Sequence, residues 1–235
     1  MRVLLMRTCL SDALAPSVWR SARRVLRRAG VEVEVPRGQT CCGQPAWTAG
    51  HPDQARAVAR RALAAFAGDA PVVVPSGSCA AMVTHAYPEL FAGTPEEQDA
   101  RRLAARTLEL TQLIERHGLA VASAARGRVA YHDSCHMLRL LGERESARAA
   151  IRRTGTLELV EIEESSSCCG FGGVFSVAFP EVSGALGEEK ARRAAETGAD
   201  ALVACDLSCL LHIAGRARRL GIPLRPRHVA EVLAE

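Results

Sequence analysis

Eight of the nine cysteines fall into two sets with nearly the same internal spacing. The sets are Cys9, Cys41, Cys42 and Cys79, and Cys135, Cys168, Cys169 and Cys209. Successive members are 32, 1 and 37 residues apart in the first set and 33, 1 and 40 residues apart in the second. Glycine follows each adjacent pair, and serine precedes each last cysteine. A pattern of this length that occurs twice indicates an internal duplication.

Four thiolates from three separate segments match the ligand count of an iron–sulfur cluster or of a structural zinc ion. Adjacent side chains of an extended segment point in opposite directions, so a turn at Gly43 and at Gly170 is needed to aim both thiols of a pair at one site. A multi-iron cluster is large enough to meet both thiols, and the pattern therefore favours clusters in at least one half. Zinc sites that only hold the fold, a thiol–disulfide couple and simple core cysteines remain the alternatives.

Three further side chains are candidate ligands in the second half. Cys205 lies four residues before Cys209, and His132 and His136 flank Cys135. The two histidines are able to bind metal or to relay protons, although a structural hydrogen bond explains His132 equally well. Because the second half carries these extra groups, we expect it to be the richer redox site and the first half to hold zinc or a less reactive cluster.

The segments between the cysteines predict alternating strands and helices. Short apolar runs end just before the first or the last cysteine of each set, and helical patterns lie between them. The expected strands are residues 2–6, 31–35, 72–74, 129–132 and 201–204, and the expected helices are residues 16–29, 53–66, 94–117 and 185–197. Such alternation predicts parallel sheets with right-handed crossovers, whose ligands lie at the carboxyl ends of the strands.

The expected fold is therefore α/β, with two duplicated lobes that have parallel sheets and flanking helices and are related by a pseudo-twofold axis. The first cysteine-rich domain is predicted to span residues 1–119 and the second residues 127–235. The small-residue stretch 120–127 is the predicted linker.

Composition excludes several classes of function. The 235 residues carry a net charge of only +4 and 4% aromatic residues, and no basic run is interleaved with aromatics, which argues against nucleic-acid binding. The apolar run at residues 3–6 is too short for a signal peptide, and no stretch approaches the ~18–20 apolar residues of a membrane span. We expect a cytoplasmic protein without direct membrane insertion. Nine cysteines are an odd number and fit a disulfide framework poorly.

Four stretches carry a resemblance to a known family. They read TCCGQPA at residues 40–46, PSGSC at residues 75–79, HDSCH at residues 132–136 and CCGFGG at residues 168–173. They resemble the lactate-utilization protein A family, whose members are tandem cysteine-rich CCG-domain proteins related to the B subunit of heterodisulfide reductase. The resemblance covers nearly the whole chain.

The resemblance implies an iron–sulfur oxidoreductase subunit that takes part in the oxidation of L-lactate to pyruvate. It implies a ferredoxin-like iron–sulfur partner and a third lactate-utilization subunit. The implied cofactor is a [4Fe-4S] cluster in at least one lobe, with zinc as the alternative in the other, held by the eight cysteines of the two sets. A zinc-stabilised scaffold and a heterodisulfide-reductase-like thiol/disulfide oxidoreductase subunit are the alternative functions.

The chain departs from the general CCG pattern at one position in each copy. That pattern ends in Cys-x-x-Cys, whereas Ser76 and Asp206 stand here in place of the first of these two cysteines. The noncubane cluster associated with heterodisulfide reductase uses five cysteines. With four cysteines in each set, an ordinary [4Fe-4S] cluster or zinc is expected instead, and Cys205 is a substitute ligand in the second copy alone.

Overall fold

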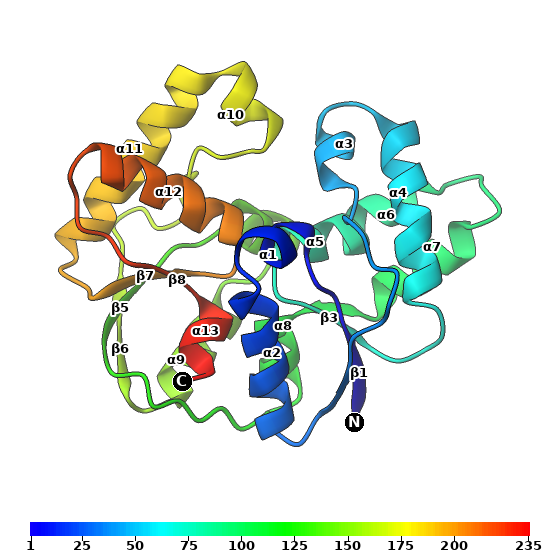
Figure 1. The fold of residues 1–235 in the computed structure, drawn as a ribbon, viewed down its shortest axis with the longest axis horizontal. Helices are drawn as coiled ribbons and strands as arrows, with labels where there is room; N and C mark the ends of the chain where they lie inside the picture. Colours follow the sequence, from blue (N-terminus) through cyan, green and yellow to red (C-terminus); the bar gives the residue numbers. More distant parts are fainter. The chain divides into compact units, whose positions relative to one another are not determined.

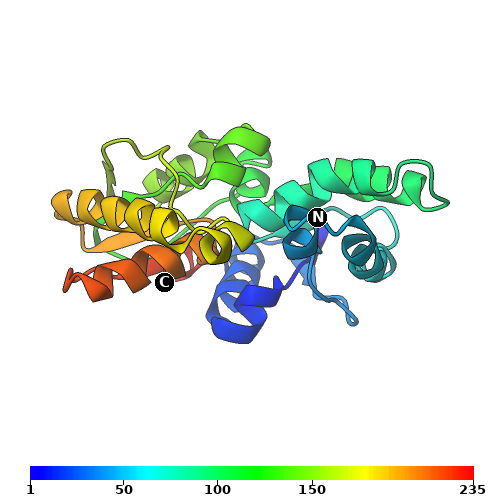
Figure 2. The same cartoon turned by 90° about the horizontal axis from the view of Figure 1, so that it is seen from above.

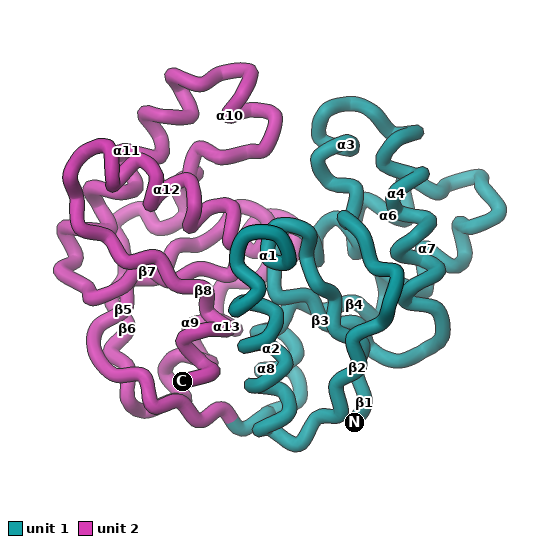
Figure 3. The backbone as a smooth tube through the Cα atoms, in the orientation of Figure 1, with its two compact units in different colours: residues 1–120 teal, residues 121–235 magenta.

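The computed structural model describes residues 1–235, which divide into two compact units, Met1–Ala120 and Val121–Glu235 (Figure 3). Each unit contains a four-stranded parallel sheet flanked by helices (Figure 1). The strand order is β2-β1-β3-β4 in unit 1 and β6-β5-β7-β8 in unit 2, so the second unit repeats the order of the first. The prediction of a duplicated α/β fold with parallel sheets is confirmed.

Unit 1 begins with the strand that leads to Cys9. Its elements are β1 (Arg2–Leu5), α1 (Cys9–Leu14), α2 (Ser17–Arg28), β2 (Glu32–Glu34), α3 (Gln44–Thr48), α4 (Pro52–Ala65), β3 (Val72–Val74), α5 (Gly77–Ala81), the π-helical turn η1 (Met82–Ala86), α6 (Tyr87–Leu90), α7 (Glu97–Ala105), β4 (Thr107–Glu109) and α8 (Leu110–Arg116).

The helix that follows the first cysteine shows how the sequence specifies these elements. In α2, the apolar side chains of Val18, Ala22, Val25 and Leu26 recur at helical spacing, and all four are buried. The central strand β3 is buried on both faces, as is typical of a strand inside a parallel sheet.

The prediction of one helix over residues 94–117 is wrong. The structure places β4 between α7 and α8, and its three residues are all buried and pair with β3. The helical start signal lies at the end of this strand: the carboxylate of Glu109 accepts a hydrogen bond from the backbone N–H of Thr111, and the side chain of Gln112 returns a bond to the backbone N–H of Glu109. Pairing with the sheet outweighs the helical periodicity over these few residues.

Unit 2 repeats the succession of four parallel strands with a different set of helices between them. Its elements are β5 (Gly127–Tyr131), the π-helical turn η2 (His136–Leu140), α9 (Glu145–Arg153), β6 (Leu157–Glu161), α10 (Val174–Ala178), α11 (Pro180–Glu196), β7 (Ala201–Ala204), α12 (Leu207–Arg219), β8 (Pro226–His228) and α13 (Val229–Leu233).

Part of the core of unit 2 lies where helices α11 and α12 pack side by side over the sheet (Figures 1 and 2). Cys169 and Cys209 belong to this cluster of buried residues, together with Ala130 and Leu202 of the central strands. Two thiols of the second set are thus embedded in apolar surroundings. None of the helices combines the length and the apolar character that a bilayer-spanning segment needs.

Candidate metal centres

The structure brings the first cysteine set together beyond the carboxyl ends of the strands of unit 1. Cys9 opens α1 after β1, Cys41 and Cys42 lie in the loop after β2, and Cys79 lies in α5 after β3. The Sγ atoms of Cys9 and Cys41 are 3.5 Å apart, and those of Cys42 and Cys79 are 3.4 Å apart. Hydrogen bonding between Cys41 and Cys42 joins the two halves of the set.

The second set converges in the same way in unit 2. Cys135 precedes η2, Cys168 and Cys169 lie in the loop after β6, and Cys209 lies in α12 after β7. The Sγ atoms of Cys169 and Cys209 are 3.0 Å apart. Cys168 is hydrogen-bonded to both Cys135 and Cys169, so the four thiols form one continuous group.

Burial divides each set into two inner and two outer thiols. The second cysteine of each adjacent pair and the last cysteine are buried, namely Cys42, Cys79, Cys169 and Cys209. Cys9 is exposed, and Cys41, Cys135 and Cys168 are intermediate. No disulfide joins any of the nine cysteines. Each site is therefore anchored in the unit's interior and reaches its surface.

One thiol in each set is strongly favoured as a thiolate. Hydrogen bonds from Cys42 and Cys9, together with the backbone N–H of Gly43, lower the pKa of Cys41 to about 2. Hydrogen bonds from Cys135 and Cys169 lower the pKa of Cys168 to about 2 in the same way. The donating thiols have raised pKa values because hydrogen bonding to the partner thiol and burial both favour their protonated forms. Metal binding would release these protons, since the thiolate is the ligand.

The glycine after each pair makes the turn that the sequence predicts. Gly43 and Gly170 have φ values of 89° and 87°, in the left-handed region that favours glycine. Their backbone N–H groups donate to the Sγ atoms of Cys41 and Cys168 over 3.4 and 3.3 Å. A Cβ atom at Gly170 would lie 2.3 Å from the carbonyl oxygen of Ser183 in α11. The left-handed turn at both positions favours glycine, and at Gly170 the close approach to α11 requires it.

In unit 1, two side chains hold the loop that carries the adjacent pair. The side-chain amide of Gln39 accepts from the backbone N–H of Arg7 and donates to the carbonyl oxygens of Leu5 and Pro36. The buried hydroxyl of Tyr87 donates to the carbonyl oxygen of Cys42 over 3.0 Å. Gln39 thus ties the end of β1 to the loop.

In unit 2, an ion-pair network around the buried side chain of Arg148 connects the segments that carry the cysteines. The guanidinium of Arg148 makes paired hydrogen bonds of 2.6 and 2.8 Å to the carboxylate of Asp133, two residues before Cys135. It makes another pair, each of 2.8 Å, to Glu161 at the end of β6. Ser165, in the loop that leads to Cys168, donates to Asp133 over 2.8 Å.

The hydrogen bonds of this network favour the charged forms of both Arg148 and Asp133. Burial by itself would lower the pKa of Arg148, but the hydrogen bonds to Glu161 and Asp133 outweigh it and raise that pKa. Burial would likewise raise the pKa of Asp133, but the bonds from Arg148 and Ser165 outweigh it and lower that pKa. The chain's one lysine, Lys190, is buried and donates to the carbonyl oxygens of Glu164 and Ser165 in the same loop. Sequence reasoning identified none of these residues, since ordinary charged residues far apart in the chain give no local signal.

The positions that lack the expected fifth cysteine have structural roles. Ser76 is the N-cap of α5, and its hydroxyl accepts a hydrogen bond from the backbone N–H of Cys79. Asp206 is the N-cap residue of α12, and its carboxylate accepts a bond of 2.5 Å from the hydroxyl of Ser134. Both residues thus anchor the segment that presents the last cysteine.

The three additional candidates differ in their placement. Cys205 is fully buried at the end of β7, where its Sγ lies 3.3 Å from the hydroxyl of Tyr131. His136 begins η2 and is partly exposed. His132 is fully buried and forms a group with Cys169 and Cys209 in which the potential ligand atoms all lie within 4.8 Å of one another. Of the three, His132 is the one that the structure places among the buried thiols.

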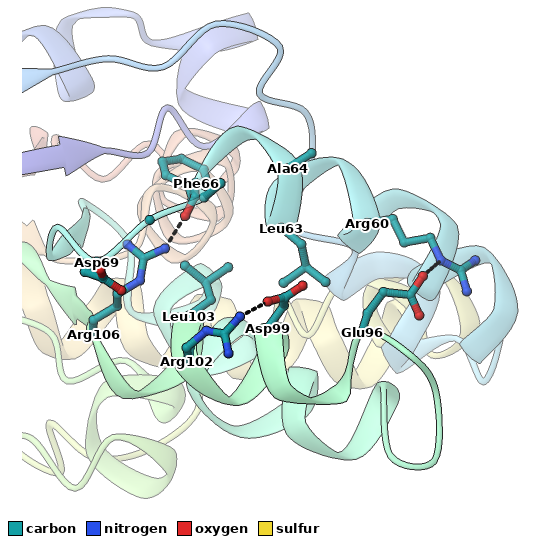
Figure 4. Close-up of a pocket in the computed structure, with 12 residues that line it drawn as sticks. Arg60, Leu63, Ala64, Phe66, Asp69, Glu96, Asp99, Arg102, Leu103 and Arg106 are labelled. Atoms are coloured by element: carbon teal, nitrogen blue, oxygen red, sulfur yellow. Dashed lines mark hydrogen bonds and ion pairs between the residues drawn. The ribbon is translucent and has the colours of Figure 1, made fainter.

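A cavity of about 750 Å³ in unit 1 lies between α4 and α7 (Figure 4). The lining contains no cysteine, and its three guanidinium groups already have acceptors. Arg60 bonds Glu96 over 2.8 Å, Arg102 pairs with Asp99, and Arg106 donates to the carbonyl oxygen of Phe66. The cavity therefore offers less chemistry than the two cysteine sets.

A comparison with protein families also finds two copies of one domain in the chain. Residues 3–84 and 129–214 each match the family model of the CCG cysteine-rich domain. "Lactate utilization protein A" of Geobacillus thermodenitrificans is 44% identical over 236 residues, covering 99% of this chain and 98% of the relative. The protein of the same name from Halalkalibacterium halodurans is 43% identical and covers 99% of this chain and 96% of the relative.

A solved structure also resembles the chain. It is a hypothetical protein from Helicobacter pylori, with a TM-score of 0.63 and 11% sequence identity. The match covers 97% of this chain and 47% of that one. At this identity, the likeness shows the fold alone.

Proposed function

Since this chain belongs to the lactate utilization protein A family, with two copies of the CCG cysteine-rich domain, we propose that it is an iron–sulfur subunit of a system that oxidises L-lactate to pyruvate. The observation that carries the proposal is the pair of four-thiol sites at the carboxyl ends of two parallel sheets. An iron–sulfur cluster supplies one-electron transfer when it is bound. The role in lactate utilization comes from the family, and the electron-transfer role from the chemistry of the sites.

The donor sets fit such a cofactor. Each unit supplies four thiols from three segments, which is the ligand count of a [4Fe-4S] cluster. Sulfur ligands select soft metals over magnesium or calcium. We assign the ligands as Cys9, Cys41, Cys42 and Cys79 in unit 1 and as Cys135, Cys168, Cys169 and Cys209 in unit 2.

The chain's own groups would set the properties of each site. The inner thiols of unit 2, Cys169 and Cys209, lie among buried apolar side chains, and burial is one determinant of a cluster's reduction potential. The N–H groups of Gly43 and Gly170 donate to sulfur, and such bonds also shift the potential. The outer thiols lie near the surface, which would let electrons pass to a partner.

Four exposed apolar side chains follow the second site in the sequence. Directly after the loop with Cys168, the side chains of Val174, Val177, Phe179 and Val182 are 42%, 81%, 58% and 54% exposed. Contiguous exposed apolar side chains are typical of interaction sites. This surface, which we call the α10–α11 apolar surface, supports docking of the ferredoxin-like iron–sulfur subunit beside the site that would exchange electrons with it. The proposal includes a cytoplasmic location, where thiols stay reduced and free to bind metal.

The purified chain alone is expected to show little or no lactate-dependent dye reduction. Its sequence has no dinucleotide-binding fingerprint, and removal of two electrons from a 2-hydroxy acid needs an acceptor for them. Activity is expected when the iron–sulfur partner and the third subunit are added. The measurement is anaerobic dye reduction by the chain alone and by the reconstituted mixture.

The α10–α11 apolar surface provides the control for assembly. Val177→Asp is expected to lower the reconstituted activity and partner capture while leaving the metal content unchanged. Leu14→Asp, at a residue of unit 1 that is 63% exposed, is expected to change neither. Strong lactate oxidation by the chain alone would contradict the subunit role. Unchanged partner capture by the Val177 variant would contradict the docking surface.

A zinc-stabilised scaffold is the second candidate function, and the spacing of the sulfur atoms favours it. Four thiolates at about 2.3 Å from a single zinc ion lie roughly 3.8 Å apart. The Sγ···Sγ distances of the hydrogen-bonded pairs Cys9–Cys41 and Cys42–Cys79 are 3.5 and 3.4 Å, near that value, and that of Cys169–Cys209 is 3.0 Å. A cluster with a separate iron for each thiolate would hold the sulfur atoms farther apart. Under this alternative, the chain assembles its partners without carrying electrons.

A further inference from the structure

His132 is a buried imidazole with no nitrogen or oxygen partner for its ring. Its side chain is fully buried and interacts with the thiol of Cys209, whose pKa is lowered first by hydrogen bonding with Cys169 and further by His132. Its backbone N–H donates to the carbonyl oxygen of Val203 over 2.9 Å, which extends the pairing of β5 with β7 by one residue. The sheet therefore fixes the backbone that carries the ring. A buried imidazole beside thiols, with no nitrogen or oxygen partner, is a group whose remaining bonding capacity a metal ion would satisfy.

The ring lies beside the two inner thiols of the second set. One imidazole nitrogen and the Sγ atoms of Cys169 and Cys209 all lie within 4.8 Å of one another. A metal ion that binds nitrogen at about 2.0–2.1 Å and sulfur at about 2.3 Å holds these atoms roughly 3.5–3.8 Å apart. Small movements of the side chains would bring all three atoms onto one metal.

Unit 1 has a different residue at the equivalent place. The backbone N–H of Met6 donates to the carbonyl oxygen of Val73 over 2.9 Å, as that of His132 does to Val203. Met6 also precedes Cys9 by three residues, as His132 precedes Cys135. Met6 is buried, but its thioether is a weak hydrogen-bond acceptor that burial does not leave in need of a partner. Unit 1 therefore has only thiols at its site, whereas unit 2 has an additional imidazole, and the two units can be compared directly.

We propose that His132 is a metal ligand of the second site, together with Cys169 and Cys209, so that the two units hold chemically different centres. The inference rests on metal binding by unit 2 but not on the identity of the metal. A neutral imidazole adds no negative charge to the four thiolates of the set. In Rieske centres, histidines in place of two cysteines raise the reduction potential, so a thiolate in the place of His132 is expected to lower the potential of the second centre.

X-ray absorption at the metal edge of the anaerobically purified full chain tests this proposal. The wild type is expected to show nitrogen scattering at about 2.0–2.1 Å beside the sulfur shell. His132→Met, which copies the residue of unit 1, is expected to lose this scattering. His136→Ala provides the matched control on the other side of Cys135 and is expected to keep it.

Two further readouts separate a ligand from a packing residue. Metal affinity of unit 2, measured by chelator competition, is expected to fall by at least about tenfold in His132→Met. His132→Cys is expected to restore the affinity without the nitrogen signal and, for an iron–sulfur centre, to lower the midpoint potential. Both comparisons use the metal-loaded chain and do not depend on lactate oxidation.

The wild-type spectrum decides the proposal even if a variant fails to fold. A sulfur shell without nitrogen would overturn the assignment of His132 and leave the iron–sulfur function intact. Nitrogen scattering that survives in His132→Met would overturn it as well. Zinc with a nitrogen ligand that His132→Met removes would support the assignment of His132 while contradicting the iron–sulfur function.

Discussion

Cys169→Ser is expected to remove most of the cluster absorbance of the protein together with the metal of unit 2. Cys169 is buried, and its Sγ lies 3.0 Å from that of Cys209 at the inner end of the second set. A serine hydroxyl is a poor ligand for a soft metal, and it would also be buried among apolar side chains. The measurement is metal and sulfide content per chain together with the visible spectrum.

Cys42→Ser provides the matched change in unit 1, where Cys42 occupies the place of Cys169. We expect it to remove the metal of unit 1 but less of the visible absorbance, because the second site is proposed to be the richer redox centre. Cys205→Ser, outside the two sets, is expected to leave both metals in place. Equal losses of absorbance from Cys42→Ser and Cys169→Ser would contradict the difference between the units.

Arg148→Met is expected to destabilise unit 2 by about 3–5 kcal/mol, the cost of removing one partner from a buried ion pair. The guanidinium is 2% exposed and neutralises Asp133, whose side chain is also 2% exposed, so the change leaves a buried carboxylate without its cation. Cys135 and the loop to Cys168 would lose their common anchor. Urea unfolding of the metal-free chain, followed by probes in each unit separately, measures the effect.

Arg60→Met is the control for this change. Arg60 and Glu96 form an ion pair in unit 1 whose side chains are 49% and 30% exposed, and such pairs contribute about 0–1 kcal/mol. Its loss should shift the unfolding of unit 1 only slightly. A similarly small shift for Arg148→Met would show that the network does not hold the second site.

Much of the fold could be predicted because the signals are local and occur twice. The Cys-Cys-Gly triplets, the helical spacing in α2 and the apolar run of β3 each fix an element within a few residues. β4 could not be predicted, because its three residues are set by pairing with β3 and carry too little pattern to interrupt a helix. Parallel pairing between distant segments leaves no signal of its own in the sequence.

The residues of the candidate sites also differ in whether the sequence alone could identify them. The eight cysteines of the two sets were identifiable from spacing, and the structure brings each set together. The network around Arg148 joins residues 13 to 32 positions apart and depends on where the sheet places them. His132 and His136 were both candidate ligands in the sequence, and only the structure distinguishes the buried ring just after β5 from the partly exposed ring at the start of η2.

Anaerobic iron, sulfide and zinc analysis of the purified chain, with its visible spectrum, tests the central claim most directly. The account predicts a brown protein that absorbs near 400 nm and contains iron and acid-labile sulfide, with any zinc confined to unit 1. Colourless protein with stoichiometric zinc in both units and no sulfide would contradict the iron–sulfur function and leave the zinc-stabilised scaffold as the explanation of the two cysteine sets.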